Sequence, residues 1–271
     1  MAQSPTKQQA KRISARERIQ EAQRREQQAA KRRQRIVVTV SAVVVLALAG
    51  GVALAINTGS KKDDKASAAS SAAPLVVPAN ASGPDGTVIT YGKADAPHTM
   101  EVYEDFRCPV CKHFEAANGQ TVKEITQEGQ IKVEFHLAAF LDKNLGGKGS
   151  RTALAAAGAA LNEGVDKFKA FHDVLYANQP DERSDAFGDV NHLLDLAGQV
   201  PGLKTDAFVK AVTDKTYAPW AAKVADAFND SGVTGTPTVK VDGKPINVFA
   251  GNSAATPEQF TAQVKQAAGL Q

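Results

Sequence analysis

The sequence predicts an α/β domain with an inserted helical module, preceded by one transmembrane helix and a flexible linker. Three observations predict this arrangement. Near the N-terminus, 21 consecutive residues carry no charge. Further on, strand-like alternation and helical spacing of apolar residues surround the two cysteines of the chain in the order β-α-β. A long helical tract then separates this unit from a second group of strands, which indicates an insertion.

Residues 1–35 form a strongly basic tail. They contain 11 Lys and Arg against three Glu, about +8, whereas the rest of the chain has 21 basic and 26 acidic side chains, about −5. Such a tail could bind nucleic acid, but it lies directly before the uncharged residues 36–56. A helix of that length reaches about 31 Å, the thickness of the hydrocarbon layer of a bilayer. The tail therefore predicts a cytoplasmic N-terminus and an exported remainder, with no nucleic-acid partner.

The uncharged segment is expected to stay in the membrane as an anchor that contacts lipid. A cleaved signal peptide is the alternative, because Ala47-Leu48-Ala49 fits the small-residue cleavage pattern. The apolar run continues past that site, which favours the anchor. Residues 57–85 are rich in Ala, Ser, Lys, Asp and Pro, a composition typical of a flexible linker. Residues 86–271 are enough for one domain with its own core.

The two cysteines, Cys108 and Cys111, are separated by Pro109 and Val110. A strand is predicted before them and a helix after them, to about residue 128, so Cys108 lies near a helix N-terminus. The N–H groups and the dipole of a helix start favour negative charge and therefore lower the pKa of Cys108. Cys111, one turn further on, is expected to be more enclosed and able to attack a mixed disulfide at Cys108. A redox-active pair is the favoured interpretation.

Other roles for this pair remain as alternatives. A structural zinc site needs four ligands, and His113 is the one further candidate nearby. A haem attachment site needs a histidine directly after the second cysteine, where Lys112 stands. A purely structural disulfide across so short a loop would stabilise the fold little. No metal and no cofactor are expected.

The remaining elements follow from periodicity and turn residues. Strands are predicted at residues 87–91, 99–106, 131–137, 238–241 and 246–249. The helical module spans about residues 149–231, with helices at residues 151–162, 166–177, 185–197, 205–216 and 219–228. His172 and His192 lie in these helices and are interpreted as structural or surface residues. Asn118 and Gly119 are candidates for a kink or an interruption of the helix after the cysteines. A helix capped by Thr256 is predicted to close the chain.

A second motif precedes the strand at residues 238–241. Residues 232–238 read Gly-Val-Thr-Gly-Thr-Pro-Thr. Pro237 leads into the strand between turn residues, which predicts a cis peptide bond, with an ordinary trans turn as the alternative. A cis bond there would leave the backbone of Thr236 free to pair with an extended peptide.

The element order and two motifs together resemble a known family. The motifs are residues 105–111, Asp-Phe-Arg-Cys-Pro-Val-Cys, and residues 233–238, Val-Thr-Gly-Thr-Pro-Thr. The chain resembles the DsbA-like thiol-disulfide oxidoreductases, which have a thioredoxin fold, and in particular the membrane-anchored bacterial type. The resemblance covers about residues 84–271.

This resemblance implies roles for four residues. Cys108 matches the nucleophilic cysteine and Cys111 the resolving one, so the two would form the redox-active disulfide. Pro237 matches the cis-proline opposite that disulfide. Thr236 matches the residue whose backbone binds the substrate.

Two departures from the family pattern concern proton and thiolate chemistry. Val110 replaces the histidine of the C-P-H-C enzymes, which helps to stabilise the thiolate there. Val102 stands where thioredoxins carry a buried acid. Glu101, Glu104 and Asp105 are then the candidates for handling the proton during resolution.

The function implied by the resemblance is a dithiol oxidase in the exported domain of a single-pass membrane protein. Its substrates would be exported proteins with free thiols, and a DsbB-like or VKOR-like membrane partner would reoxidise it. One alternative is a membrane-tethered disulfide reductase or isomerase. Another is a redox-silent peptide-binding module on a thioredoxin scaffold.

Overall fold

The computed structural model describes residues 74–251 and 253–270. The predicted basic tail, the predicted membrane segment at residues 36–56 and most of the predicted linker lie outside these residues. No helix within the described ranges is long and apolar enough to cross a membrane.

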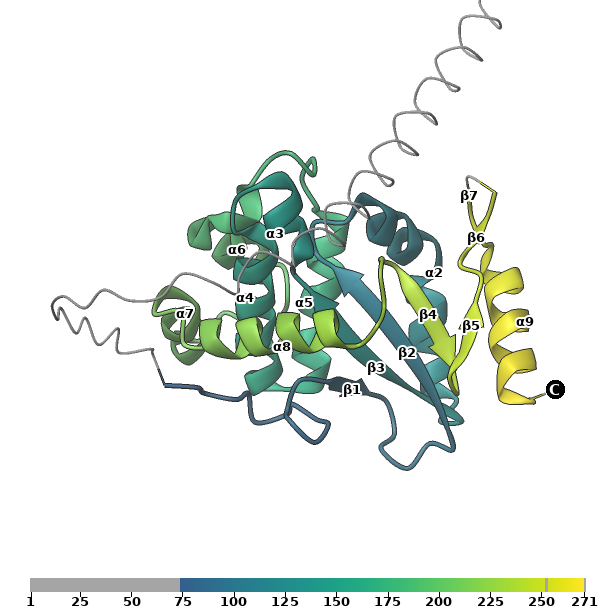
Figure 1. Ribbon diagram of the computed structural model, residues 1–271. Coiled ribbons are helices and arrows are strands. Elements are labelled where there is room, and N and C mark those ends of the chain that lie inside the picture. The colour runs from purple at the N-terminus through teal and green to yellow at the C-terminus, as the bar shows by residue number, and fades with distance from the viewer. Residues whose placement is uncertain (1–73, 252, 271) are drawn as a thin grey trace, which may run out of the picture. The chain divides into compact units, whose positions relative to one another are not determined.

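A five-stranded sheet forms the centre of the domain (Figure 1), in the order β1-β3-β2-β4-β5. Its strands are β1 Ile89–Tyr91, β2 His98–Asp105, β3 Ile131–Ala138, β4 Thr238–Val241 and β5 Lys244–Ile246. The β2 and β3 strands are parallel, and the other neighbours are antiparallel. Because β2 is the middle strand, the segment that leads into the cysteines is held on both sides.

Helix α2, Pro109–Gln127, connects β2 to β3 and confirms the predicted β-α-β unit. Its buried apolar side chains include Phe114, Val122 and Ile125, which recur at helical spacing. The helix continues without interruption through the pair that was a candidate for a break. Asn118 is buried there and donates from Nδ2 to the carbonyl of Ala255 at 3.0 Å, so a tertiary contact satisfies its polar side chain.

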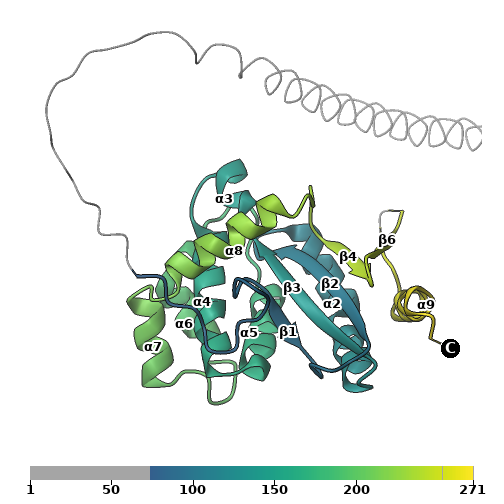
Figure 2. The same ribbon diagram turned by 60° about the horizontal axis from the view of Figure 1, so that its bottom comes forward.

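The helical module lies between β3 and β4 in the chain. It comprises α3 Phe140–Leu145, α4 Gly149–Glu163, α5 Val165–Ala177, the 3₁₀-helix η1 Ala186–Gly188, α6 Val190–Ala197, α7 Asp206–Thr213 and α8 Ala218–Asp230. Figures 1 and 2 both show these helices gathered on the β1 and β3 side of the sheet. One cluster of buried apolar side chains runs from the sheet into the module. The module and the sheet therefore share a core.

The module differs from its prediction in three places. It begins with α3, earlier than expected. The helix predicted at residues 185–197 is split into η1 and α6, because Asp189 has an extended backbone and its side chain accepts from the N–H of Asn191 as a cap. The helix predicted at residues 205–216 ends at Thr213, and Lys215 beyond it has a positive φ of 56°.

The strand predicted at residues 246–249 is wrong in position. Asp242 and Gly243, with φ of 49° and 76°, form the two-residue turn between β4 and β5. This short turn places the start of β5 at Lys244, and Pro245 is tolerated because β5 is an edge strand. Phe249–Ala250 (β6) pairs instead with Ser253–Ala254 (β7).

Helix α9, Pro257–Ala268, closes the chain as predicted. Thr256 accepts from the N–H of Gln259, and the Gln259 side chain accepts in return from the N–H of Thr256. This reciprocal cap defines the start of the helix. The helix packs against α2 and β5, on the side of the sheet away from the module (Figures 1 and 2).

Candidate active site

Cys108 lies at the junction of β2 and α2. It is the N-cap residue of α2 and has an extended backbone, and Pro109 occupies the first helical turn, where its missing N–H costs nothing. The N–H of Cys108 donates to the carbonyl of Asp105 at 2.8 Å. The Cys108 side chain is 6% exposed and that of Cys111 is fully buried, so the predicted difference in enclosure is confirmed.

The two thiols have opposite electrostatic environments. A hydrogen bond from the Cys111 side chain lowers the pKa of Cys108 to about 6 against the opposing effect of burial, and contacts with Thr236 and with the N–H groups of Cys111 and Val110 act in the same direction. Burial raises the pKa of Cys111 well above its ordinary value. These opposite shifts favour a thiolate at Cys108 and a thiol at Cys111 at neutral pH.

The second motif lies directly beside Cys108. The peptide bond between Thr236 and Pro237 is cis, as predicted. The Sγ atom of Cys108 lies 3.5 Å from the carbonyl oxygen of Thr236, across 128 positions of sequence. Among the described residues, the N–H of Thr236 has no hydrogen-bond partner. The fold thus brings together all four residues that the sequence singled out, and it leaves a backbone donor free beside the thiolate.

Comparison with known proteins agrees with this geometry. A family model described as thioredoxin matches residues 85–266, more than half of the chain. The chain belongs to the thioredoxin family. Disulfide bond formation protein D of Bacillus subtilis (strain 168) is 31% identical over 160 residues, which cover 59% of this chain and 69% of that protein.

Two solved structures are similar to this chain in both fold and sequence. Oxidised BdbD from Bacillus subtilis superposes with a TM-score of 0.57 at 25% identity, covering 72% of this chain and 100% of that one. Oxidised DsbA from Mycobacterium tuberculosis gives a TM-score of 0.54 at 27% identity, covering 66% and 88%. The protein is a DsbA-like thiol-disulfide oxidoreductase.

A buried carboxylate braces the active-site loop of this thioredoxin-family domain. Asp105 Oδ1 accepts from the N–H of Arg107 at 2.9 Å and from the hydroxyl of Ser150 at 2.6 Å. Its Oδ2 accepts from the N–H of Leu141 at 3.2 Å. Because Leu141 and Ser150 belong to α3 and α4, the last residue of β2 is tied to the helical module.

Arg107 makes a second connection between the loop and the module. Its guanidinium is 2% exposed and donates to Asp142 at 2.9 Å and to the carbonyls of Gly146 and Glu182 at 2.8 and 3.0 Å. Sequence reasoning missed this role, although a charged residue directly before the first cysteine was a visible signal. The partners could not be identified, because they come from separate parts of the module.

Gln179 holds the loop from the other side. Its side-chain Nε2 donates to the carbonyls of Phe106 and Cys108 at 2.8 and 3.0 Å. Lys112 Nζ donates to the Gln179 backbone carbonyl at 2.9 Å. The segment between α5 and η1 therefore fixes the backbone on either side of Arg107.

Charged side chains from β2, α2 and α5 form a cluster in the interior of the domain. Glu104 and His172 are both fully buried, and Glu104 Oε2 lies 3.0 Å from His172 Nε2. Glu104, Glu115 and His172 each offer a possible metal ligand atom, all within 4.8 Å of one another. Burial opposes a positive charge on Lys169, but the charges of Glu115, Asp173 and Glu104 outweigh it and raise the pKa of the Lys169 ammonium group. The carboxylates of this cluster therefore already have a cation beside them. This cluster therefore fits proton chemistry better than metal binding.

Proposed function

We propose that the protein is an extracytoplasmic dithiol oxidase that introduces disulfides into exported proteins through a redox-active Cys108–Cys111 pair. The observation that carries this proposal is the lowered pKa of Cys108. A stabilised thiolate favours the reduced form, and a stabilised reduced form makes a disulfide strongly oxidising. The likeness to Bacillus subtilis disulfide bond formation protein D supports the same direction of transfer.

The reaction proceeds by two thiol-disulfide exchanges. A substrate thiolate attacks Sγ of Cys108 in the oxidised protein, the Cys108–Cys111 bond breaks, and Cys111 leaves and takes up a proton. A second substrate thiolate then attacks the substrate sulfur of the mixed disulfide. The substrate disulfide forms, the Cys108 thiolate is released, and two electrons have passed to the protein.

Thr236 and Pro237 form the substrate-binding edge in this proposal. The free N–H of Thr236 would pair with a carbonyl of an extended substrate segment, as in strand addition. Such pairing would place a substrate sulfur against Cys108, because the Thr236 carbonyl is already 3.5 Å from its Sγ.

The cellular arrangement is part of the same proposal. Residues 1–35 would form a cytoplasmic tail, residues 36–56 a membrane anchor, residues 57–85 a linker and residues 86–271 the exported domain. A DsbB-like or VKOR-like membrane partner would remove the two electrons. The exported location suits disulfide formation, which belongs to oxidising compartments.

The reduction potential of the full-length protein in detergent, equilibrated against glutathione buffers, tests the direction of transfer. We expect a value near that of DsbA, about −120 mV. A value near that of thioredoxin, about −270 mV, would instead identify a membrane-tethered reductase or isomerase. If the two thiols do not interconvert with a disulfide at all, the domain is a redox-silent peptide-binding module.

Substrate trapping in cells tests the roles of the cysteines. In the full-length Cys111→Ser variant, Cys108 can still attack a disulfide of an exported protein, but the thiol that would displace that protein from the mixed disulfide is missing, so adducts with exported proteins should accumulate on non-reducing gels. The double variant Cys108→Ser, Cys111→Ser is the matched control and should show none. A Cys111→Ser protein that is free of adducts would contradict the assignment of Cys108 as the nucleophile.

A further inference from the structure

Cys111 presents a proton-transfer problem, because it is fully buried yet must gain a proton when it leaves the disulfide. Three acidic residues precede the motif. Glu101 accepts from the hydroxyl of Tyr103 at 2.7 Å and is itself partly exposed. Both oxygens of Asp105 already accept hydrogen bonds from the active-site loop and the module. Glu104 alone of the three has a buried oxygen, Oε1, without a partner among the described residues.

Glu104 faces the helical module. Its Oε2 atom lies 3.0 Å from Nε2 of His172 in α5, and Phe106 follows two residues later, just beyond the end of β2. The Phe106 ring packs against the rings of His172 and Tyr176, with centroids 5.7 and 5.4 Å apart. The charge of Glu104 also contributes, after burial and the contact with Cys108, to the raised pKa of Cys111. The carboxyl is therefore within electrostatic reach of the buried thiol.

His172 links Glu104 to a second carboxylate. Its Nε2 atom lies 3.0 Å from Glu104 Oε2, and its Nδ1 atom lies 3.3 Å from Asp173 Oδ1. Asp173 is held in turn by an ion pair with Lys169. Both ring nitrogens of a fully buried imidazole thus contact acids, an arrangement that can pass a proton through the ring.

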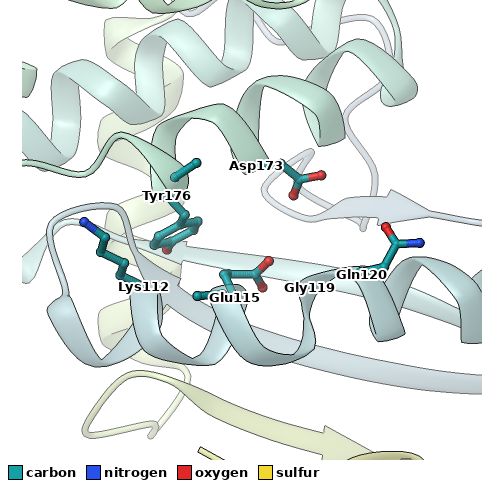
Figure 3. Close-up of a pocket in the computed structure, with 8 residues that line it drawn as sticks. Lys112, Glu115, Gly119, Gln120, Asp173 and Tyr176 are labelled. Atoms are coloured by element: carbon teal, nitrogen blue, oxygen red, sulfur yellow. The ribbon is translucent and has the colours of Figure 1, made fainter. Parts of the chain in front are cut away.

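Asp173 also lines a pocket between α2 and α5. Its volume is about 350 Å³, and Glu115, Asp173 and Tyr176 are among its lining residues. Figure 3 shows Glu115 rising from α2 toward the α5 side chains. Glu115 lies one turn after Cys111 and has an oxygen within 4.8 Å of the polar atoms of Glu104 and His172. It therefore stands between the buried pair and the open pocket.

We propose that Glu104 and His172 form a proton relay for Cys111, and that Glu115 and the pocket between α2 and α5 connect the relay to solvent. The helical module, which supplies His172, thereby takes part in the chemistry as well as in packing. This inference rests on the proposed redox role of Cys108 and Cys111.

The relay supplies and removes the Cys111 proton in the two halves of the redox cycle, substrate oxidation and reoxidation of the protein. When a substrate thiolate attacks Cys108, Cys111 leaves with the electron pair of the broken S–S bond and takes a proton from the relay, which is reloaded from solvent. During reoxidation, Cys108 is first joined to the partner in a mixed disulfide. The relay then accepts the Cys111 proton as Cys111 Sγ attacks Cys108 Sγ, and the partner sulfur departs as a thiolate.

The protonation of the cluster suits this role. Burial, with the charge of Glu115, raises the pKa of Glu104 to about 8. Burial opposes charge on His172, but hydrogen bonds to Asp173 and Glu104 raise its pKa to about 9. The charged groups that face the pair are Glu115 from α2 and Lys169 and Asp173 from α5. The pair therefore holds a proton to deliver at neutral pH and can exchange it in that range.

The test follows the closing step in full-length protein. Reduced protein is mixed with oxidised glutathione, and the conversion of the Cys108–glutathione mixed disulfide into the Cys108–Cys111 disulfide is measured across the pH range in which the relay titrates. Glu104→Gln should slow this step by about 100-fold, a typical loss for general acid–base catalysis, and should flatten its pH profile. The rate of Cys108 alkylation, which needs no proton from Cys111, should stay within about threefold of wild type.

Two further variants make the result specific. Glu101→Gln, on the same strand but bonded to Tyr103, should keep the wild-type pH profile. Glu115→Gln, half-buried at the pocket, keeps the relay pair and should slow closure with an altered pH profile even if Glu104→Gln does not fold. Wild-type rates and profiles in both Glu104→Gln and Glu115→Gln, or in Glu115→Gln alone if Glu104→Gln does not fold, overturn the relay. A wild-type protein that never closes the disulfide overturns the proposed function instead.

Discussion

At Cys108, the surroundings of one sulfur atom set the reactivity of the protein. The family pattern raised a doubt here, because Val110 replaces a histidine that helps to stabilise the thiolate in related enzymes. The structure shows other donors in its place, led by the Cys111 thiol and including the first N–H groups of α2. The thiolate is therefore stabilised by the helix start and the neighbouring cysteine.

This leads to a prediction for the alkylation of Cys108. In the reduced protein, the rate of alkylation at Cys108 should rise with pH around a midpoint near 6. Cys111→Ala removes the largest contribution, so the alkylation midpoint of the variant should move up toward the ordinary thiol pKa of 9.0. Mass spectrometry of the alkylated peptide measures both rates. Equal midpoints in the two proteins would show that Cys111 does not stabilise the thiolate.

Among the helices, α4 is the element on which the module is assembled. Most of its residues from Ala153 to Leu161 are small and buried, and it contacts α5, α7 and α8. At Gly158, α4 lies tightly against Trp220 of α8, since a Cβ atom there would lie 2.7 Å from Cζ3 of the indole ring. The lack of a side chain at this position lets the indole ring pack directly on the helix.

Gly158→Ala should therefore destabilise the protein, although alanine is the better helix former. Alanine in a helix interior stabilises the fold by about 0.5–1 kcal/mol relative to glycine, whereas overpacking against a buried ring costs about 1–3 kcal/mol. We expect a net loss of about 1 kcal/mol or more in the free energy of unfolding, measured by urea denaturation. Gly235→Ala is the control, because nothing lies within 4 Å of a Cβ there and its stability should be close to wild type.

The connection between β2 and α4 gives a second prediction for the elements. Ser150→Ala removes the 2.6 Å hydrogen bond to the buried Asp105 carboxylate, whose pKa burial already raises. The loss should lower the free energy of unfolding by about 1–3 kcal/mol. Ser184→Ala, at an exposed serine, should change it little. Equal stabilities of the two variants in urea would show that this bond does not hold the loop to the module.

For the whole molecule, the ionisation of Cys108 couples the redox state to folding stability. The lowered pKa stabilises the folded reduced protein at every pH above about 6, because the native Cys108 thiol is ionised there and its surroundings favour the thiolate. This contribution is present in full above the ordinary pKa of 9.0 and is lost as the pH falls through about 6. The oxidised protein has no such titration, and the raised pKa of Cys111 acts above that window.

Reduced protein should accordingly gain stability over oxidised protein as the pH rises from about 6 to about 9. A pKa lowered from 9.0 to about 6 corresponds to about 4 kcal/mol at the upper end. Urea unfolding of both redox forms at several pH values measures the difference. The Cys108→Ser variant, which has no disulfide form, should lack the gain in stability that reduced wild-type protein shows between about pH 6 and 9, and a redox difference that shrinks with rising pH would contradict a stabilised thiolate.

The sequence by itself determined the features that depend on neighbouring residues. Alternation and helical spacing predicted β2, α2 and β3, and Thr256 as a cap predicted the start of α9. The position of Cys108 at a helix start followed from the same patterns. These features are local, because periodicity and capping need only residues within a few positions of one another.

Only the tertiary structure decided which distant residues meet. His172 was interpreted as structural or surface, yet it lies 3.0 Å from Glu104, 68 positions away. Arg107 donates to partners in two separate segments of the module, Asp142 and Gly146 in one and Glu182 in the other. Such pairs depend on how helices pack against the sheet, which no local pattern specifies. The elements and the cysteine motif were therefore predictable, while the charged cluster behind them required the packed fold.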